Sequence, residues 1–454
     1  MTTTIDDAGL RDLGDRISGD VVLPGDETWE TARQAWNLAV DQRPVAIVYA
    51  ESADDVVATV GHAAERGLHI AFNAGGHNAG PIGWTGPTIL LKTERMRGIT
   101  VAPAARTARV EAGVLAKSLA VAAGEHGLSY LAGTAPDVGV LGYILGGGLS
   151  WMVREHGLAC NTIVAAEVVT ADGRLVRTDR STEPDLFWAL RGGSGNVGAV
   201  TALEIELFPI TEIFAGAMFW PIERAAEILA AWRGWIEAVP VTCESLGRML
   251  QLPDLPFIPE PVRGRSFVLV EVAFLGSASD GAALVQPLRD LGPVMDNLTV
   301  MPPSELSVVN MDPDFPLPYS GEGILLADLP TDAIPGVVDA FAGSPLLHLE
   351  VRQLGGAAAV HSKDHGVLDA IDQPFVMFTF GLTPDADARG AVDRQVQEVL
   401  AALEPWDSGR RYLNFAESAM DPRSIYPVEG YERLLAIRQR YDPAGLFIAN
   451  HPVR

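Results

Sequence analysis

The chain has 454 residues, a length that corresponds to roughly two or three domains. Its 33 basic and 58 acidic residues give a formal net charge of −25, so binding to nucleic acid or to an anionic membrane surface is not expected. The two cysteines, Cys160 and Cys243, are too few for a disulfide scaffold or a multi-cysteine metal site. We predict no metal site, and because no signal peptide is visible we expect a cytoplasmic protein.

The first predicted elements form a β–α–β unit. Residues 44–49 are an apolar, β-branched run of strand length. Ser52 can cap a helix that should stop at Gly67, because serine favours the first position of helices and glycine their end. Residues 68–72 are a second short strand, and they lead into a glycine loop at residues 73–80. A loop of this kind is a common way to present backbone amides to a phosphate.

Two further segments are rich in glycine. Residues 133–148 contain six glycines, a density that suits either close approach to a ligand or a set of tight turns. Residues 193–198 match the G-x-G-x-x-G pattern, but the segment before them looks helical and the segment after them alternates like a strand. A Rossmann fingerprint needs the reverse order, so we do not predict a Rossmann site or a nicotinamide cofactor.

The remaining elements predict an α+β protein. A strand at residues 161–171, a turn at Asp172 and Gly173, and a second strand at residues 174–177 form a predicted hairpin. The strand that ends near Pro209 marks the expected domain boundary. Beyond it we predict a sheet with helices on one face. Its strands cover residues 215–220, 266–275 and 346–354, and its helices carry apolar stripes at residues 224–239, 334–341 and 392–403.

One predicted strand, residues 346–354, carries three polar residues on a single face. Alternation places His348, Glu350 and Arg352 together. Such a face is unusual for a buried strand, so it belongs either to a ligand pocket or to a solvent-facing edge. The sequence by itself leaves both interpretations open.

Five motifs follow one another along the chain: GGHNAG at 75–80, PDVGVLGYILGGG at 136–148, REHGLACNTI at 154–163, DLFWALRGGSGNVGAVT at 185–201 and YDPAGLFIANHPV at 441–453. Together and in this order they resemble the vanillyl-alcohol-oxidase/PCMH flavoprotein superfamily, and within it the berberine-bridge-enzyme-like group. The resemblance covers nearly the whole chain. It implies a segment at 1–39, a two-part PCMH-type FAD-binding domain at 40–210, a substrate domain with an antiparallel sheet covered by helices at 211–408, and a C-terminal segment at 409–454 that returns to the FAD domain.

The resemblance implies that FAD is the cofactor and that His77 carries it covalently. His77 follows the glycine pair Gly75-Gly76 in the first glycine loop, where the family links the C8 methyl group of the flavin to a neutral imidazole. The residue-based alternative is a histidine that hydrogen-bonds a phosphate. Many members add a second link from a cysteine, but the corresponding residue here is Ala135. We therefore expect attachment through His77 only.

The remaining cofactor contacts follow from the same resemblance. The first glycine loop should hold the diphosphate, the second should lie under the flavin ring, and Asn450 should reach the ring from the C-terminus. The expected cofactor-binding residues are Asn73, Ala74, Gly75, Gly76, His77, Asn78, Ala79, Gly133, Thr134, Val138, Gly139, Gly142, Tyr143, Gly147, Asn161, Ile163, Val200 and Asn450.

The implied activity is an oxidase that takes a hydride from a small organic substrate and reduces O₂ to hydrogen peroxide. Glu350 is the candidate base and Arg352 the orienting group, with Tyr412 and Asn414 as further catalytic candidates on a strand beside the flavin. In the family a valine at the position of Val138 accompanies oxidases, because it leaves room for oxygen beside the ring. The alternatives are a dehydrogenase with another electron acceptor and a flavin-binding protein without redox chemistry. The sequence gives neither the substrate, which we expect to be a secondary-metabolite intermediate, nor the oligomeric state.

Overall fold

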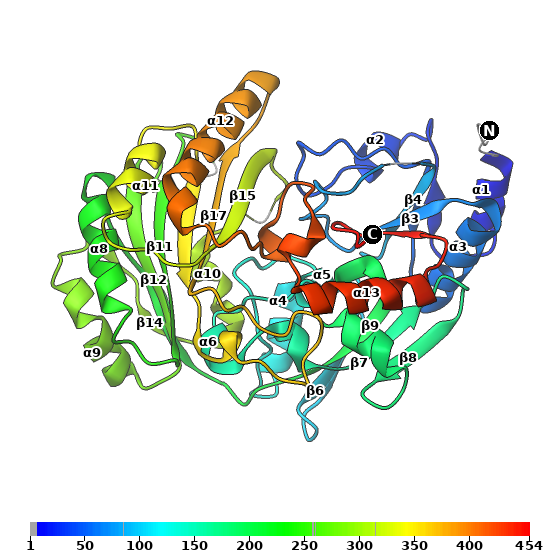
Figure 1. Ribbon diagram of the computed structural model, residues 1–454, viewed down its shortest axis with the longest axis horizontal. Coiled ribbons are helices and arrows are strands. Elements are labelled where there is room, and N and C mark those ends of the chain that lie inside the picture. The colour runs from blue at the N-terminus through cyan, green and yellow to red at the C-terminus, as the bar shows by residue number, and fades with distance from the viewer. Residues whose placement is uncertain (1–6, 85, 257, 259, 314) are drawn as a thin grey trace.

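The protein is described by a computed structural model that covers residues 7–84, 86–256, 258, 260–313 and 315–454. Within these residues, eighteen strands form three sheets. Seventeen of them follow one another as hydrogen-bonded neighbours, and the remaining strand, β14, pairs with β10 of the largest sheet outside that order. The two five-stranded sheets lie in one half of the molecule, and the eight-stranded sheet with its covering helices lies in the other (Figure 1). Helices and mainly antiparallel sheets confirm the predicted α+β class.

The first five-stranded sheet is assembled from both ends of the chain. Its order is β1-β2-β4-β3-β18, and all neighbours run parallel except β1 and β2. Because β18 pairs with β3, the predicted return of the C-terminal segment to the N-terminal half is confirmed (Figure 1). The strands are β1 (Asp20–Val22), β2 (Ala46–Tyr49), β3 (His69–Asn73), β4 (Thr88–Lys92) and β18 (Phe447–Ile448).

Helix α3 (Ala53–Arg66) connects β2 to β3 and has the predicted ends. The side chain of Ser52 accepts a hydrogen bond from the backbone N–H of Asp55 at 3.2 Å. Gly67 follows the last turn with φ at 65°, a left-handed conformation that glycine adopts without steric cost. The β–α–β unit therefore delivers the chain directly into the glycine loop after β3.

The second five-stranded sheet has the order β5-β6-β9-β7-β8 and is antiparallel throughout. β7 and β8 form the predicted hairpin. Helix α7 (Pro184–Leu190) precedes the G-x-G-x-x-G match and β9 follows it, so the order is the reverse of a Rossmann site, as expected. The strands are β5 (Ile99–Ala102), β6 (Thr107–Glu111), β7 (Ile163–Val169), β8 (Leu175–Asp179) and β9 (Ala199–Glu206).

The eight-stranded sheet is antiparallel and has the order β13-β10-β12-β11-β16-β17-β15, with β14 paired to β10. β16 lies between β11 and β17, so the solvent-facing-edge interpretation of this strand is wrong. The strands are β10 (Ile213–Pro221), β11 (Cys243–Gln251), β12 (Ser266–Phe274), β13 (Met295–Asp296), β14 (Thr299–Met301), β15 (Tyr319–Leu326), β16 (His348–Gln353) and β17 (Phe375–Leu382).

Helices cover the outer face of this sheet (Figure 1). Trp232, Phe341 and Val399 from three of these helices pack with Leu349 and Val351 of β16 in one hydrophobic core. The even-numbered residues of β16 consequently face the other half of the molecule. The covering helices are α8 (Ala225–Trp235), α9 (Ala278–Arg289), α11 (Ile334–Phe341) and α12 (Ala386–Leu403).

The remaining helices are short, apart from α13, which runs across the N-terminal half (Figure 1). They are α1 (Asp7–Gly14), α2 (Trp29–Ala32), α4 (Ala116–Gly124), α5 (Val140–Leu145), α6 (Val153–His156), α10 (Ser307–Asn310) and α13 (Val428–Tyr441). In the part of the chain described here, no helix is both long and apolar enough to span a bilayer.

Two segments differ from the expected strands. Residues Leu413–Phe415 form a 3₁₀ turn rather than a strand, with the N–H of Phe415 bonded to the carbonyl of Tyr412 at 3.0 Å. The predicted strand from residue 161 begins instead at Ile163, because Ala159–Thr162 are also a 3₁₀ turn. The side chain of Asn161 accepts a hydrogen bond from the distant N–H of Gly366, a tertiary contact that periodicity does not show.

The buried carboxyl group of Glu244 on β11 should make the free energy of unfolding fall as the pH rises. The residue is 1% exposed, and burial raises the pKa of its carboxyl group to about 8, despite the opposing charges of Arg352 and Arg154. A folded-state pKa above the unfolded value stabilises the fold at low pH, and this contribution disappears as the pH rises towards 8. In Glu244→Gln the fall in unfolding free energy between pH 5 and 8 should be smaller by about 1.4 kcal/mol per pH unit. Denaturant titrations at several pH values measure this slope, and an unchanged slope would contradict the shift.

Candidate flavin and substrate site

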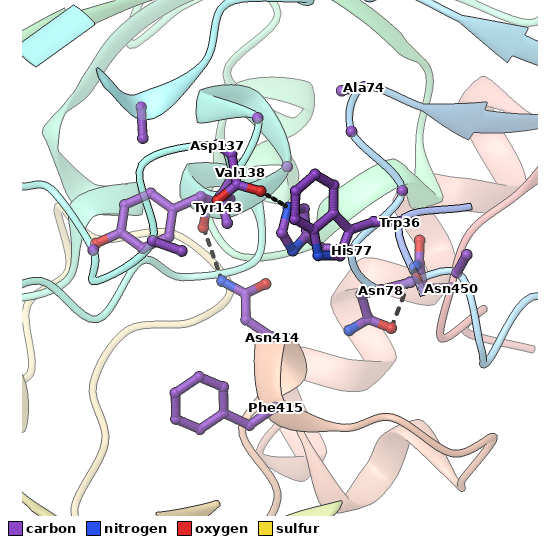
Figure 2. A pocket seen from close by; sticks show the side chains of 18 of the residues that line it. Trp36, Ala74, His77, Asn78, Asp137, Val138, Tyr143, Asn414, Phe415 and Asn450 are labelled. Carbon is purple, nitrogen blue, oxygen red and sulfur yellow. Dashed lines mark hydrogen bonds and ion pairs between the residues drawn. The ribbon is translucent and has the colours of Figure 1, made fainter. Parts of the chain in front are cut away.

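A cavity of about 400 Å³ lies between the two halves of the molecule. The two glycine-rich loops line one side, opposite Asn414 and Phe415 of the turn after Tyr412 (Figure 2), and β16 and β17 also line the cavity. The cavity brings together most of the predicted site. The predicted residues that line it are Asn73, Ala74, Gly75, Gly76, His77, Asn78, Ala79, Gly133, Thr134, Val138, Gly139, Gly142, Tyr143, Val200, Glu350, Arg352, Tyr412, Asn414 and Asn450.

The two glycine-rich loops have unpaired backbone donors. Within the described residues, no hydrogen-bond acceptor is found for the N–H groups of residues 74–80, nor for those of residues 133–135 and 137–139. The loops lie against each other, since a Cβ on Gly139 would stand 3.3 Å from the Cβ of Ala74. Close approach and open amides are what a diphosphate requires. The arrangement therefore fits FAD and explains part of the glycine density.

His77 occupies the point where the two loops meet. Its Nε2 lies 3.1 Å from Oδ2 of Asp137 on the second loop. The ring of Trp36 stacks on the imidazole with centroids 4.5 Å apart and planes inclined by 17°, and the hydroxyl of Tyr319 donates to the His77 carbonyl at 3.2 Å. In Figure 2 Trp36 and Asp137 lie on different sides of the histidine ring. The imidazole is thus oriented by two separate segments, and a third segment holds the backbone of His77.

The C-terminal segments are tied to the same loops. The amide of Asn450 donates to the carbonyl of Asn78. The Asn414 amide donates to the Tyr143 carbonyl at 3.0 Å and to the Tyr412 hydroxyl at 3.1 Å (Figure 2). These bonds show why residues near position 414 and the C-terminus reach a site built mainly by the N-terminal half.

Three predicted cofactor residues are absent from the lining of this cavity. Gly147, with φ at 126°, packs against Leu368 and the ring of Tyr412. The Asn161 side chain is bonded to the backbone of residues 366 and 368. Ile163 begins β7 within the hydrophobic core. Their contact with FAD remains a prediction.

Neither cysteine lines the cavity, whereas Ala135 does. Cys160 and Cys243 are fully buried, and burial raises the pKa of each thiol to about 12. Both thiols are therefore protonated at neutral pH, which makes them poor nucleophiles. Both cysteines are therefore placed as packing residues.

The sheet face opposite the loops carries a row of buried polar groups. His348 Nε2 lies 3.4 Å from Glu350 Oε2, and Glu350 Oε1 lies 3.6 Å from the Arg352 guanidinium. Arg248 on β11 extends the row: its Nε donates to His348 Nδ1 at 3.1 Å, and it pairs with Glu271 at 2.8 Å. The alternation predicted for β16 is confirmed, and this face is a pocket wall.

The charges of this row follow from its contacts. Burial alone would raise the pKa of Glu350, but His348 and the positive charges of Arg352 and Arg248 hold it at about 2. Burial and Arg248 lower the pKa of His348, so its imidazole is neutral at pH 7. Since Nδ1 accepts from Arg248, the ring proton is on Nε2, which faces Glu350. Glu350 is consequently a permanent anion at the cavity wall.

Several lining residues were missed by the sequence analysis. Asp137 lies inside a quoted motif but was given no role. Trp36, Tyr319, Phe378, Phe380, Phe415 and Glu417 also line the cavity. Aromatic residues are equally typical of a core, so no local signal separated these from packing residues. Burial raises the pKa of Glu417 to about 8, with a contribution from Glu322.

Comparison with known proteins identifies the class. Residues 44–179 match a family model described as an FAD binding domain. (R)-6-hydroxynicotine oxidase from Paenarthrobacter nicotinovorans is 28% identical over 96% of this chain and 97% of its own length. Glucooligosaccharide oxidase from Sarocladium strictum is 35% identical over 46% of this chain and 43% of its own length.

Solved structures agree with this match. 6-Hydroxy-D-nicotine oxidase from Arthrobacter nicotinovorans has a TM-score of 0.83 and 26% identity, covering 96% of this chain and 98% of its own. Berberine bridge enzyme from Eschscholzia californica has a TM-score of 0.83 at 19% identity, covering 99% of both chains, and supports the fold alone. The chain contains an FAD binding domain, and over nearly its whole length it is similar to FAD-linked oxidases of the PCMH-type, berberine-bridge-enzyme-like group. It is an FAD-dependent enzyme, as its sequence motifs predicted.

Proposed function

We propose that this enzyme is an oxidase that removes a hydride from a small organic substrate and passes the electrons to O₂, giving hydrogen peroxide. The observation that carries the proposal is a single cavity with an FAD cradle on one wall and the ionised Glu350 on the other. Bound FAD supplies the two-electron acceptor. The substrate enters between the two walls, and its class is an alcohol, an amine or a precursor that closes a ring on oxidation.

Different side chains bind the substrate, accept its proton and exclude water. Glu350 accepts the polar hydrogen of the substrate O–H or N–H, and His348 Nε2–H stabilises the carboxylate from the side away from Arg352. Arg352 orients the substrate through its guanidinium, which is 2% exposed at the side chain. Tyr412 and Asn414 hold the turn against Tyr143 and position the cofactor loop. Phe378 and Phe380 exclude water from this part of the cavity.

Attachment of FAD through His77 alone is part of the proposal. His77 lies in the cradle and is accessible from the cavity, with 25% of its side chain exposed. The position that would supply a second link is Ala135, which has no nucleophile. Names of relatives include a nicotine oxidase and an oligosaccharide oxidase, and these two substrate classes are the first to test.

The experiment is a reduction and reoxidation cycle with a panel of amines, alcohols and sugars. Substrate added without air should bleach the bound flavin, and admission of air should restore the colour with release of peroxide. Bleaching that persists for hours in air would make the enzyme a dehydrogenase with another acceptor. If no member of a broad panel bleaches the flavin while dithionite does, a protein without redox chemistry is favoured.

Val138 provides a direct test of the reaction with oxygen. The residue lines the cavity between Asp137 and Gly139, where we expect a small apolar space beside the flavin ring. In Val138→Leu the larger side chain should fill this space and slow reoxidation of the reduced flavin by ~10-fold or more, about 1.4 kcal/mol in activation free energy. Stopped-flow mixing of reduced enzyme with oxygenated buffer measures the rate. Reduction by substrate should change less, and equal slowing of both half-reactions would contradict a role as an oxygen gate.

A further inference from the structure

Asp137 and His77 form the one hydrogen bond between side chains of the two cofactor loops in the described part of the chain. His77 Nε2 and Asp137 Oδ2 are 3.1 Å apart. The second carboxyl oxygen, Oδ1, is buried and has no hydrogen-bond partner among the described residues. The carboxylate is therefore directed at the histidine rather than at a structural partner. Nothing in the proposed function so far uses this contact.

The contact decides which imidazole nitrogen is free. An ionised carboxylate only accepts hydrogen bonds, so the ring proton of neutral His77 must be on Nε2. Nδ1 then keeps its lone pair, and it has no partner in the described residues. The stacked Trp36 ring restricts rotation of the imidazole. The histidine is thus held with one defined nitrogen available for bond formation.

We propose that Asp137 is a positioning residue for the covalent attachment of FAD to His77, an inference that rests on the proposed covalent link. Asp137 fixes the tautomer in which Nδ1 is nucleophilic. It also stabilises the positive charge that the imidazole gains as Nδ1 forms its new bond. A carboxylate that orients an imidazole and stabilises its cation has the same function in the Ser-His-Asp triad.

The step balances with dioxygen as the oxidant. A bond forms between Nδ1 and the C8 methyl carbon, and that carbon loses one C–H bond. One proton leaves the methyl group and one leaves the imidazole through Nε2, on the side of Asp137. Two electrons remain in the flavin, and O₂ removes them together with both protons as hydrogen peroxide. Asp137 itself is unchanged at the end.

The test is the rate at which full-length protein attaches FAD. Protein produced in riboflavin-limited cells is mixed with FAD in air, and the intact mass is followed with time. Asp137→Asn preserves the shape of the side chain but removes the charge, and its amide N–H₂ can donate to Nε2 and favour the wrong tautomer. We expect attachment to slow by up to ~10⁴-fold, the loss seen when a triad carboxylate is replaced by its amide.

Two further measurements distinguish positioning from folding. Noncovalent FAD affinity and the thermal midpoint of Asp137→Asn should match those of wild type, because the change is isosteric. Asp312→Asn removes a negative charge from another part of the cavity lining and should attach FAD at the wild-type rate. Asp137→Ala should be as slow as Asp137→Asn, and added formate should accelerate it by supplying a carboxylate.

The outcomes are separable. Wild-type protein that gains mass, together with an Asp137→Asn variant that gains it equally fast, would overturn the role of Asp137 and leave the covalent link intact. Slow attachment that formate leaves unchanged, with a lowered FAD affinity, would assign Asp137 to packing and also overturn the inference. If wild-type protein gains no mass with FAD and air, the covalent link itself fails, whereas the oxidase activity can still be established by the bleaching cycle.

Discussion

Acid precipitation of His77→Ala should release all of its flavin, whereas the wild-type precipitate should stay yellow. The reason is that Nδ1 of His77 is the free nucleophile at the junction of the two cofactor loops, and alanine has none. The intact mass of wild-type protein should exceed the sequence mass by one FAD, and that of the variant should equal it. His77→Ala should still bind FAD noncovalently, because the open amides of both loops remain.

Substitution of the cysteines is the matched control. Cys160→Ser and Cys243→Ser should retain the full covalent yield, since both thiols are buried and protonated at neutral pH. A flavin-labelled peptide that contains either cysteine would contradict attachment through His77 alone. A colourless wild-type precipitate would contradict covalency and leave His77 as a noncovalent contact.

Local sequence predicted the elements that depend on local interactions. The ends of α3 followed from Ser52 and Gly67, because a serine cap and a left-handed glycine act within one turn. The alternation of β16 followed from the period of two of an extended strand, which fixes both faces at once. Once five motifs had indicated the family, the order of the two cofactor loops and the return of the C-terminus followed from the resemblance.

The remaining part of the site depends on contacts between distant segments. Trp36 and Tyr319 are 283 positions apart, yet both contact His77. Neither the strand pattern of β15 nor the short segment around Trp36 contains a signal for this meeting. The strand expected around Tyr412 is a 3₁₀ turn because the Asn414 amide bonds to Tyr143 and Tyr412, and such bonds are not visible as periodicity.

The protonation states of the polar residues on β16 could not be predicted from the sequence, because they depend on a residue of another strand. The sequence places His348, Glu350 and Arg352 on one face, but it does not show that Arg248 on β11 joins them. Arg248 fixes the tautomer of His348, whose Nε2 lies 3.4 Å from Oε2 of Glu350. A general base with a pKa near 2 accepts a proton weakly, so the role we propose for Glu350 is that of a charged acceptor that shares the substrate proton in the transition state. This refines the role expected from the sequence.

Glu350→Gln should lower the rate of flavin reduction by ~10–10⁴-fold, the range for loss of general-base assistance. The amide retains the shape of the side chain but removes the anion that lies between His348 and Arg352. The protein should remain yellow and folded, because the FAD cradle is on the opposite wall. Anaerobic stopped-flow mixing with substrate measures the rate directly. Since the carboxylate stays ionised down to about pH 2, wild-type reduction should show no acidic limb from Glu350 between pH 5 and 9.

Glu244→Gln supplies the comparison, because Glu244 is also buried in this sheet but lies outside the cavity lining. It should reduce the flavin at the wild-type rate, so that loss of a buried carboxyl group is separated from loss of a substrate contact. Equal rates in wild type and Glu350→Gln would remove Glu350 from the reaction. An acidic limb near pH 6 that disappears in Glu350→Gln would show instead that substrate binding weakens the contacts with His348, Arg352 and Arg248 that hold the carboxyl pKa low.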